Sequence, residues 1–504
     1  MLPAYGTDVR VGDLRRQFES AFTDAGPRTL SGRLWTFTPA LDISETMDSS
    51  VLLPGAHGRD YITRITPSFV AEVAAQRLNG TLNYAPAFSL YALHGRETGV
   101  AHNLNMQLTA TLVPELLFFD LRGYASTQPL LGGGQYGNTG ASTGRVNDVQ
   151  TASFSAGPSI QKRLSDLATL SAGYTVSRTS SSSLAPRGTT LAVPGVNSSY
   201  TSQQENASIA LGPDFGRVNG SLSMTAMQFE GGGLYQGAHN ETVTAKTGFA
   251  ITRAITLTGS LGHETIVYGP GGPRAIDGIT WSGGVNLAPN ADSNLQLSYG
   301  HQQGSTSFSF DGSYALTTRV RFLGRYSQGV GTNLQNLQNA LAGTTPGAGG
   351  VGFINPANGA PVQLGNQLGQ QAGVYRTTTA SASAVYYTER DTVSLEWVDT
   401  QQQQLSSAGG AGFGSNSGYT ATASWQHVLS EALSASTSLQ YGTRVLPGVQ
   451  TSASTTTTVS LNLAYAVSQT ISTNLALSHG NTHGANYGFG PVHDLVVLGL
   501  RKTF

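Results

Sequence analysis

The chain has 504 residues, of which only 11% are charged, and its formal net charge is −1. Soluble domains carry roughly a quarter charged residues, so the polarity here comes mainly from Ser, Thr, Asn and Gln. The 39% hydrophobic content excludes a disordered chain, and no run of about 18 apolar residues predicts a membrane-spanning helix. The near-neutral charge gives no support for a nucleic-acid partner, and the absence of Cys excludes disulfides and covalent haem attachment.

Residues 1–31 form a separate amino-terminal segment with a helical pattern. Val11, Leu14 and Phe18 fall on one helical face, while most charged side chains lie elsewhere. Asp8 is placed to cap the start of this short amphipathic helix, and Gly26 to end it. The first residues lack the basic and apolar segments of a signal peptide.

The remainder, residues 32–504, alternates apolar and polar residues in many segments of strand length. Between His102 and Val113, the even positions from Leu104 to Leu112 are apolar, and the odd positions are uncharged polar residues. A strand points successive side chains to opposite faces. A polar face without charge suits a water-filled lumen, and an apolar face suits lipid. This pattern is typical of a transmembrane β-barrel.

The same reading along the chain predicts about 22 antiparallel strands, an even number as expected for a bacterial single-chain barrel. A polar loop is expected at 47–59, after the first strand. The predicted strands are 33–46, 60–76, 80–94, 102–113, 116–129, 149–163, 166–181, 199–212, 217–231, 238–253, 254–268, 277–288, 292–303, 304–316, 318–330, 373–390, 391–403, 418–429, 432–446, 450–467, 470–483 and 490–504.

The predicted connections differ in length from one joint to the next. Alternate joints are tight, as at 76–79, 113–115, 252–254, 289–291, 317–318 and 389–391. The joints between them are generally longer and rich in Gly and Ser, as at 130–148, 182–198 and 404–417. Short periplasmic turns and longer extracellular loops are characteristic of outer-membrane barrels.

The longest connection, residues 331–372, contains a short apolar stripe. Leu334, Leu337 and Leu341 have helical spacing, and a Gly-rich stretch follows them. A connection this long is usually functional or disordered. The stripe needs a surface to cover it, which water outside the barrel does not offer. We therefore predict that this loop folds over or into the mouth and constricts the pore, with extracellular disorder as the alternative.

The last predicted strand ends in an aromatic residue. Val496, Leu498, Leu500 and Phe504 share one face, and Lys502 interrupts that face with a side chain long enough to snorkel. A terminal aromatic on an alternating strand resembles the signal that the outer-membrane assembly machinery reads. Phe504 is the expected assembly signal.

Five stretches of the chain form a recognisable set: residues 41–46, 60–67, 102–120, 212–217 and 297–301. They resemble the outer-membrane barrel family associated with PEP-CTERM/exosortase loci, and the match is good within residues 32–330 and loose beyond them. Family members accompany genes for exopolysaccharide synthesis and export, so the resemblance implies a barrel linked to such export, without a defined biochemical activity.

Strand parity places several charged side chains on the lumen face. Arg321 and Arg325 alternate with apolar neighbours, and Asp311 lies across the same predicted hairpin. These charges either pair within the barrel wall or bias which solutes pass. The predicted lumen-lining residues are Asp120, Arg122, Lys246, Glu264, Asp311, Arg321, Arg325 and Glu396.

These observations favour a non-enzymatic outer-membrane channel. No constellation of residues predicts a catalytic site, a metal site or a cofactor. We expect a passive conduit for exopolysaccharide export or general solute passage, in contact with the lipid bilayer and the outer-membrane assembly machinery. Because such a protein is exported, its signal peptide is expected to have been removed.

Two alternatives to a conduit remain. In one, the barrel is a sheath for a periplasmic partner, either an export component or a multihaem electron carrier. In the other, it is a scaffolding or adhesion barrel whose loops carry the function. Under any of these interpretations, the segment 1–31 either plugs the pore from the periplasm, docks a partner, or is a short helix that packs on the rim or stays mobile.

Overall fold

The computed structural model describes residues 34–53, 56–129, 145–186, 197–342, 345–346, 353–354, 373–406, 414–445, 453–484 and 492–504. The amino-terminal segment 1–31, with its predicted helix, lies outside these residues. Within them, no helix is long and apolar enough to cross a membrane.

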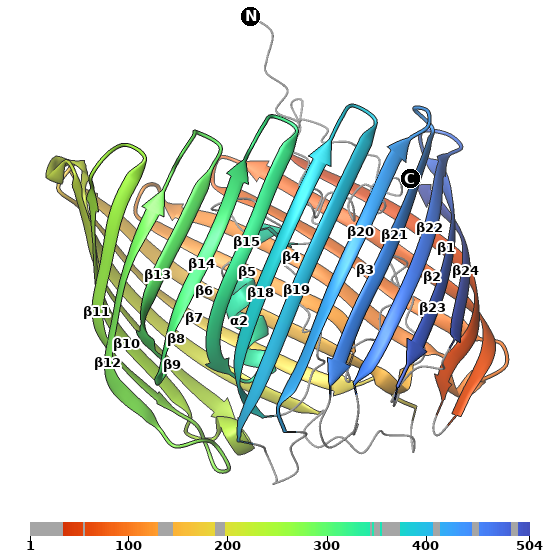
Figure 1. The fold of residues 1–504 in the computed structure, drawn as a ribbon, viewed down its shortest axis with the longest axis horizontal. Helices are drawn as coiled ribbons and strands as arrows, with labels where there is room; N and C mark the ends of the chain where they lie inside the picture. Colours follow the sequence, from red (N-terminus) through yellow and green to blue (C-terminus); the bar gives the residue numbers. More distant parts are fainter. Residues whose placement is uncertain are drawn as a thin grey trace, which may run out of the picture.

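The described chain is almost entirely β-structure (Figure 1). The strands of the first half are β1 (Trp35–Leu53), β2 (Ala56–Ala75), β3 (Leu78–Tyr91), β4 (Gly99–Val113), β5 (Leu117–Pro129), β6 (Asp148–Leu164), β7 (Ala168–Ser183), β8 (Ser198–Leu211), β9 (Val218–Gly231), β10 (His239–Ala250), β11 (Ile255–Val267) and β12 (Ile276–Leu287). The remaining strands are β13 (Asn294–Gln302), β14 (Ser305–Ala315), β15 (Val320–Gly331), β16 (Thr345–Pro346), β17 (Phe353–Ile354), β18 (Val374–Tyr387), β19 (Asp391–Ser406), β20 (Asn416–Val428), β21 (Leu433–Val445), β22 (Ser454–Ala466), β23 (Ile471–His483) and β24 (Val492–Thr503).

Few helical segments interrupt the described strands. The α-helix α2 spans Asn333–Ala342, between β15 and β16. Four short 3-10 helices are η1 (Gly95–Glu97), η3 (Arg145–Asn147), η4 (Pro213–Phe215) and η5 (Gly233–Tyr235).

The sheet closes on itself as a barrel of 22 antiparallel strands. Each strand pairs with the next along the chain, β15 pairs with β18, and β24 pairs back with β1. At this closing seam, Ala40 lies opposite Thr503 and Asp48 opposite Leu495. The predicted barrel and strand number are thus confirmed. The two-residue strands β16 and β17 pair only with each other, as a separate small sheet.

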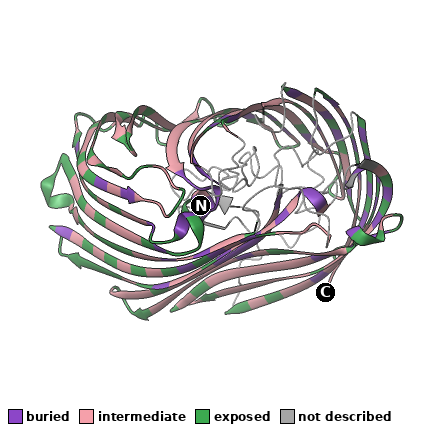
Figure 2. Ribbon diagram, turned by 90° about the horizontal axis from the view of Figure 1, so that it is seen from below, coloured by how far each residue is buried: buried purple, intermediate pink, exposed green. Residues whose placement is uncertain are grey.

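Two-residue alternation places the side chains of each strand on opposite faces. On β24, Val496, Leu498 and Leu500 are 38%, 58% and 51% exposed, whereas Leu495 and Val497, at the alternate positions, are buried. The same alternation of exposure runs along most strands (Figure 2). An apolar outer face and a closed sheet without free edges satisfy the two conditions for crossing a bilayer with strands. The chain is therefore built as a transmembrane barrel.

The first hairpin is longer than the sequence predicted. The segment 47–59, predicted as a polar loop, continues β1 to Leu53 and begins β2 at Ala56. Asp48 within this segment lies opposite Asp60, the first residue of the next predicted strand. Both are fully buried on the interior face, and each bonds a histidine, at 2.8 Å from His493 and 2.8 Å from His94. Partners from distant segments therefore let the strands extend through these charges.

The connections are mostly short on one rim and longer on the other. The turns at 76–77, 114–116, 251–254, 316–319 and 388–390 form the upper rim in Figure 1. The opposite rim carries the longer connections, with two exceptions. One is the two-residue connection 54–55 between β1 and β2, and the other is the turn at Gln303 and Gly304, where both residues have positive φ. By the usual asymmetry of outer-membrane barrels, the upper rim of Figure 1 is periplasmic.

Candidate functional site: the barrel lumen

The eight charged residues predicted to line the lumen occupy interior positions on six strands. On several of these strands the adjacent positions carry exposed apolar side chains, such as Phe119 beside Asp120 and Phe322 beside Arg321. Asp120 and Arg122 lie on β5, Lys246 on β10, Glu264 on β11, Asp311 on β14, Arg321 and Arg325 on β15, and Glu396 on β19. They are spread around the barrel and form no single site. Their role in conduction stays a prediction.

One group of these charges is brought together across β14 and β15. Asp311 lies directly opposite Arg325, with a carboxylate–guanidinium separation of 3.8 Å. Their side chains are 40% and 53% exposed, so the ion pair contributes little to stability. Arg321 lies four residues earlier on the same face of β15. This part of the wall carries two cationic groups for one anionic group.

Two other predicted lumen residues make contacts that hold the wall together. The Asp120 carboxylate accepts hydrogen bonds from the hydroxyls of Thr109 at 2.7 Å and Ser159 at 3.4 Å, on the two neighbouring strands. Glu264 is buried and accepts a hydrogen bond from the backbone N–H of Gln303 in the turn between β13 and β14. The Asp120 carboxylate therefore links β5 to β4 and β6, and the Glu264 carboxylate holds the turn between β13 and β14.

Much of the remaining interior wall is neutral and polar. A row of serines crosses five adjacent strands, from β19 to β23, each opposite the next. Their hydroxyls bond one another at 2.5 Å between Ser394 and Ser424 and at 3.2 Å between Ser460 and Ser478. The row is Ser394, Ser424, Ser438, Ser460 and Ser478. Alternation of the sequence predicted this neutral face, but the alignment of the serines depends on strand register.

The helix α2 lies inside the barrel (Figure 1). Its start is a capping box, a reciprocal pair of hydrogen bonds between an N-cap residue and the third helical residue. The Thr332 hydroxyl accepts the N–H of Gln335 at 3.1 Å, and the Gln335 side chain accepts the N–H of Thr332 at 2.9 Å. The Thr-Asn-Leu-Gln sequence specifies this helix start locally.

One face of α2 packs on the interior wall formed by β8 and β9. Leu334 and Leu337 are 6% and 2% exposed, and Leu334 belongs to a buried cluster with Tyr200 and Phe229. The Tyr200 hydroxyl donates to the side-chain oxygen of Gln338 at 2.6 Å. The third leucine of the predicted stripe, Leu341, lies outside the residues whose side chains the structure describes, as does most of the Gly-rich stretch.

The amino-terminal end of α2 contacts a different part of the wall. The Gln402 amide on β19 donates to the Asn333 side chain at 3.1 Å. Along the sheet, β8 and β19 are separated by eight intervening strands. The helix therefore reaches across part of the lumen and touches two separate arcs of the wall.

Sequence reasoning missed a buried ionic group near the extracellular rim. Besides the Asp48–His493 and Asp60–His94 pairs, Glu97 of η1 is 2% exposed and accepts the backbone N–H of Arg145 at 3.3 Å. Burial raises the pKa of the Glu97 carboxyl, and Arg145 opposes that shift. The alternation of side chains along the strand could have marked Asp48 as interior, but its partner His493 lies 445 residues away in the sequence. No group of three or more His, Asp or Glu side chains suited to a metal ion occurs in the described parts of the chain.

The carboxyl-terminal residue lies at the closing seam. The backbone N–H of Phe504 donates to the carbonyl of Pro39 on β1 at 3.0 Å, and the Phe504 ring is 71% exposed on the outer face. Behind it, Arg501 approaches Asp42 at 3.7 Å on the interior face. Recognition of Phe504 by the assembly machinery stays a prediction.

Solved structures share this fold at low sequence identity. The FrpB iron transporter from Neisseria meningitidis (F3-3 variant) is 10% identical with a TM-score of 0.52, over 93% of this chain and 82% of that one. The closed form of the ferric-catecholate import receptor Fiu from Escherichia coli K12 is 11% identical with a TM-score of 0.50, over 92% and 81%. No family model and no curated protein sequence matches the chain.

This likeness and the architecture agree on the cellular setting. At 10–11% identity the likeness establishes the fold. A closed, even-numbered antiparallel barrel with an apolar outer face and short turns on one rim is an outer-membrane structure. The chain is an outer-membrane β-barrel.

Proposed function

We propose that this barrel is a passive outer-membrane conduit for neutral, polyhydroxylated solutes, with exopolysaccharide export as its role. The observation that carries the proposal is the neutral polar interior wall. It includes the half-buried hydroxyls of Thr377, Thr379, Ser381 and Ser383 on β18, beside the mostly buried serine row from Ser394 to Ser478. Hydroxyl-lined surfaces exchange hydrogen bonds with sugar hydroxyls as readily as with water. Selectivity in such pores follows from the groups that line them and from their width.

Two further features support transport of this kind. A barrel of 22 strands encloses a wide lumen unless other segments fill it, and α2 narrows that lumen from inside. The fold likeness to an iron transporter and an import receptor supports transport as the general class of function. The resemblance of residues 32–330 to barrels of PEP-CTERM/exosortase loci supports polysaccharide as the cargo.

Bilayer conductance and sugar flux test the proposal together. The purified protein in planar bilayers should give a steady open conductance, and in liposomes it should admit neutral oligosaccharides faster than charged ones of equal size. A silent barrel that admits neither would contradict the conduit. It would favour the sheath around a periplasmic partner or the scaffolding barrel.

A further inference from the structure

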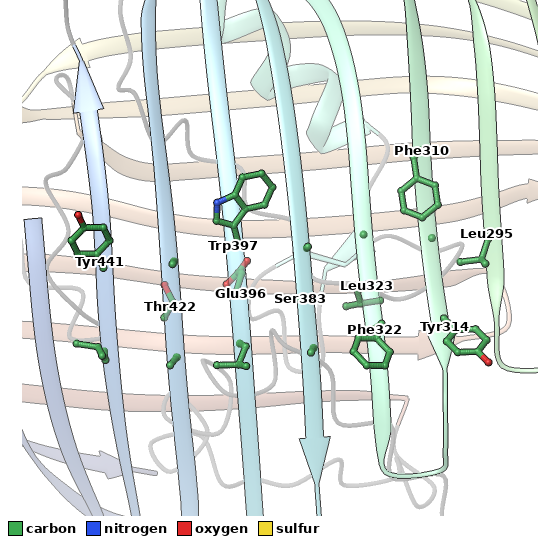
Figure 3. Close-up of a pocket in the computed structure, with 18 residues that line it drawn as sticks. Leu295, Phe310, Tyr314, Phe322, Leu323, Ser383, Glu396, Trp397, Thr422 and Tyr441 are labelled. Carbon is green, nitrogen blue, oxygen red and sulfur yellow. The ribbon is translucent and has the colours of Figure 1, made fainter. Parts of the chain in front are cut away.

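The outer face of the barrel carries an apolar groove within its membrane-facing wall. It has a volume of about 680 Å³ and lies over strands β13 to β21, within the range of small-molecule sites, roughly 300–1,000 Å³. In Figure 3, Trp397 stands between Tyr441 on one side and Phe310 on the other. The floor is made of outward-facing small residues, Gly312, Gly324, Ala382, Ala384, Ala421 and Ala423.

Strand register shapes this hollow. Gly312 lies opposite Gly324, which lies opposite Ala382. The Phe310 ring packs over the two glycines and forms one side of the groove, whereas Ala382 presents only a methyl group beside it. On the other side of β19, Ala421 lies opposite Trp397. Side chains of Phe and Tyr close the groove at its edges. The result is a depression in the surface that faces acyl chains.

Apolarity alone does not make the groove a binding site. Lipid tails are as apolar as the groove, so retention of one lipid depends on close packing of its acyl chain and on a polar contact for its head group. Trp397 and Leu395 are 42% and 57% exposed, which leaves their surfaces available for such packing. The remaining requirement is a polar group at the depth of the head groups.

That polar group lies between the groove and the periplasmic rim. Asp391 begins β19, four residues before Leu395, and Trp425 follows Ala423 by two residues on β20. One carboxylate oxygen of Asp391 accepts the Trp425 indole N–H at 2.9 Å and lies 2.8 Å from the His427 ring nitrogen. All three side chains face outward. Indole rings commonly mark the head-group level of a barrel wall.

We propose that this surface is a binding site for one phospholipid of the periplasmic leaflet whose head group carries a primary ammonium. One acyl chain occupies the groove. The ammonium donates to the second carboxylate oxygen of Asp391, whose nearest hydroxyl partner, Thr388, is 3.5 Å away. The exposed side chain of Arg390, in the same turn, is placed to meet the phosphate. The charges of the site thus complement those of a zwitterionic amine phospholipid.

Lipid retention measured by native mass spectrometry tests this site. The full-length protein would be equilibrated with equal amounts of phosphatidylethanolamine, phosphatidylcholine and phosphatidylglycerol of identical chains, then stripped of lipid stepwise. We expect one phosphatidylethanolamine to outlast the others. Asp391→Asn should reduce that preference about tenfold or more, since hydrogen bonds to charged groups are among the stronger ones.

A variant that fills the groove tests the acyl-chain site separately from the head-group site. Ala421→Leu with Ala423→Leu should lower retention of all three lipids, whereas Ala245→Leu, at an outward position of β10, should leave retention unchanged. Folding of each variant is checked by its heat-modifiable electrophoretic mobility. Equal retention of the three lipids by the wild type would overturn the proposal. Unchanged retention in the filled groove would also overturn it.

Discussion

Removing the apolar anchor of α2 should open the lumen. Leu334 and Leu337 are almost fully buried against the wall, and truncating a buried leucine costs about 2–5 kcal/mol. The double substitution Leu334→Ala/Leu337→Ala therefore withdraws about 4–10 kcal/mol of docking energy. A helix of ten residues is marginal by itself, so α2 should leave the wall when its anchor is lost.

The polar contacts of α2 are too weak to hold it alone. Side-chain hydrogen bonds join α2 and its N-cap to the wall at Tyr200–Gln338, Gln338–Ser202, Gln402–Asn333 and Tyr235–Thr332, and each contributes roughly 0.5–1.5 kcal/mol. Their total of about 2–6 kcal/mol lies below the loss of about 4–10 kcal/mol from the two leucines. The barrel itself should remain folded, because its strand ladder does not depend on the helix.

Single-channel conductance in planar bilayers measures this effect. The double alanine variant should conduct well above the wild type, and Asn339→Ala, at an exposed position of the same helix, should match the wild type. A folded double variant with wild-type conductance would refute the inference that α2 narrows the pore.

Three further outcomes are expected. Replacing Arg321 and Arg325 with Gln should move the reversal potential in a salt gradient toward cation preference. An unchanged reversal potential would mean that both arginines only form structural pairs within the barrel wall. Leu297→Arg should destabilise the folded barrel by about 2–4 kcal/mol, because a charge would face lipid, whereas Gln296→Arg, on the interior face, should not; equal urea-unfolding midpoints would contradict the register. Burial raises the pKa of Glu97. The free-energy cost of burying its charged carboxylate is therefore absent below the pKa of Glu97 in the unfolded chain and complete above its raised pKa in the folded protein. Lowering the pH between these two pKa values should increase the hydrogen-exchange protection of the backbone amides of residues 94–98 more in the wild type than in Glu97→Gln. An equal increase in both proteins would exclude this linkage.

Local periodicity determined the barrel and its two faces. In the segment from Leu104 to Leu112, alternation fixes which side chains meet lipid, because the pleat of a strand has a period of two whatever its partners are. The capping box at Thr332 likewise specifies the start of α2 within four residues. Such features need no knowledge of distant segments.

Only the tertiary structure determined which residues from distant segments are in contact. The Tyr200–Gln338 contact joins residues 138 positions apart, and Asp48 meets His493 only because the last strand closes on the first. The lipid-facing groove depends on the register that sets Gly312, Gly324 and Ala382 side by side. Sequence alone could not place these groups, because a composition rich in small and polar residues is compatible with many registers. The closed ladder of hydrogen bonds selects one of them, since a slip by one residue would turn every apolar side chain from lipid to the lumen.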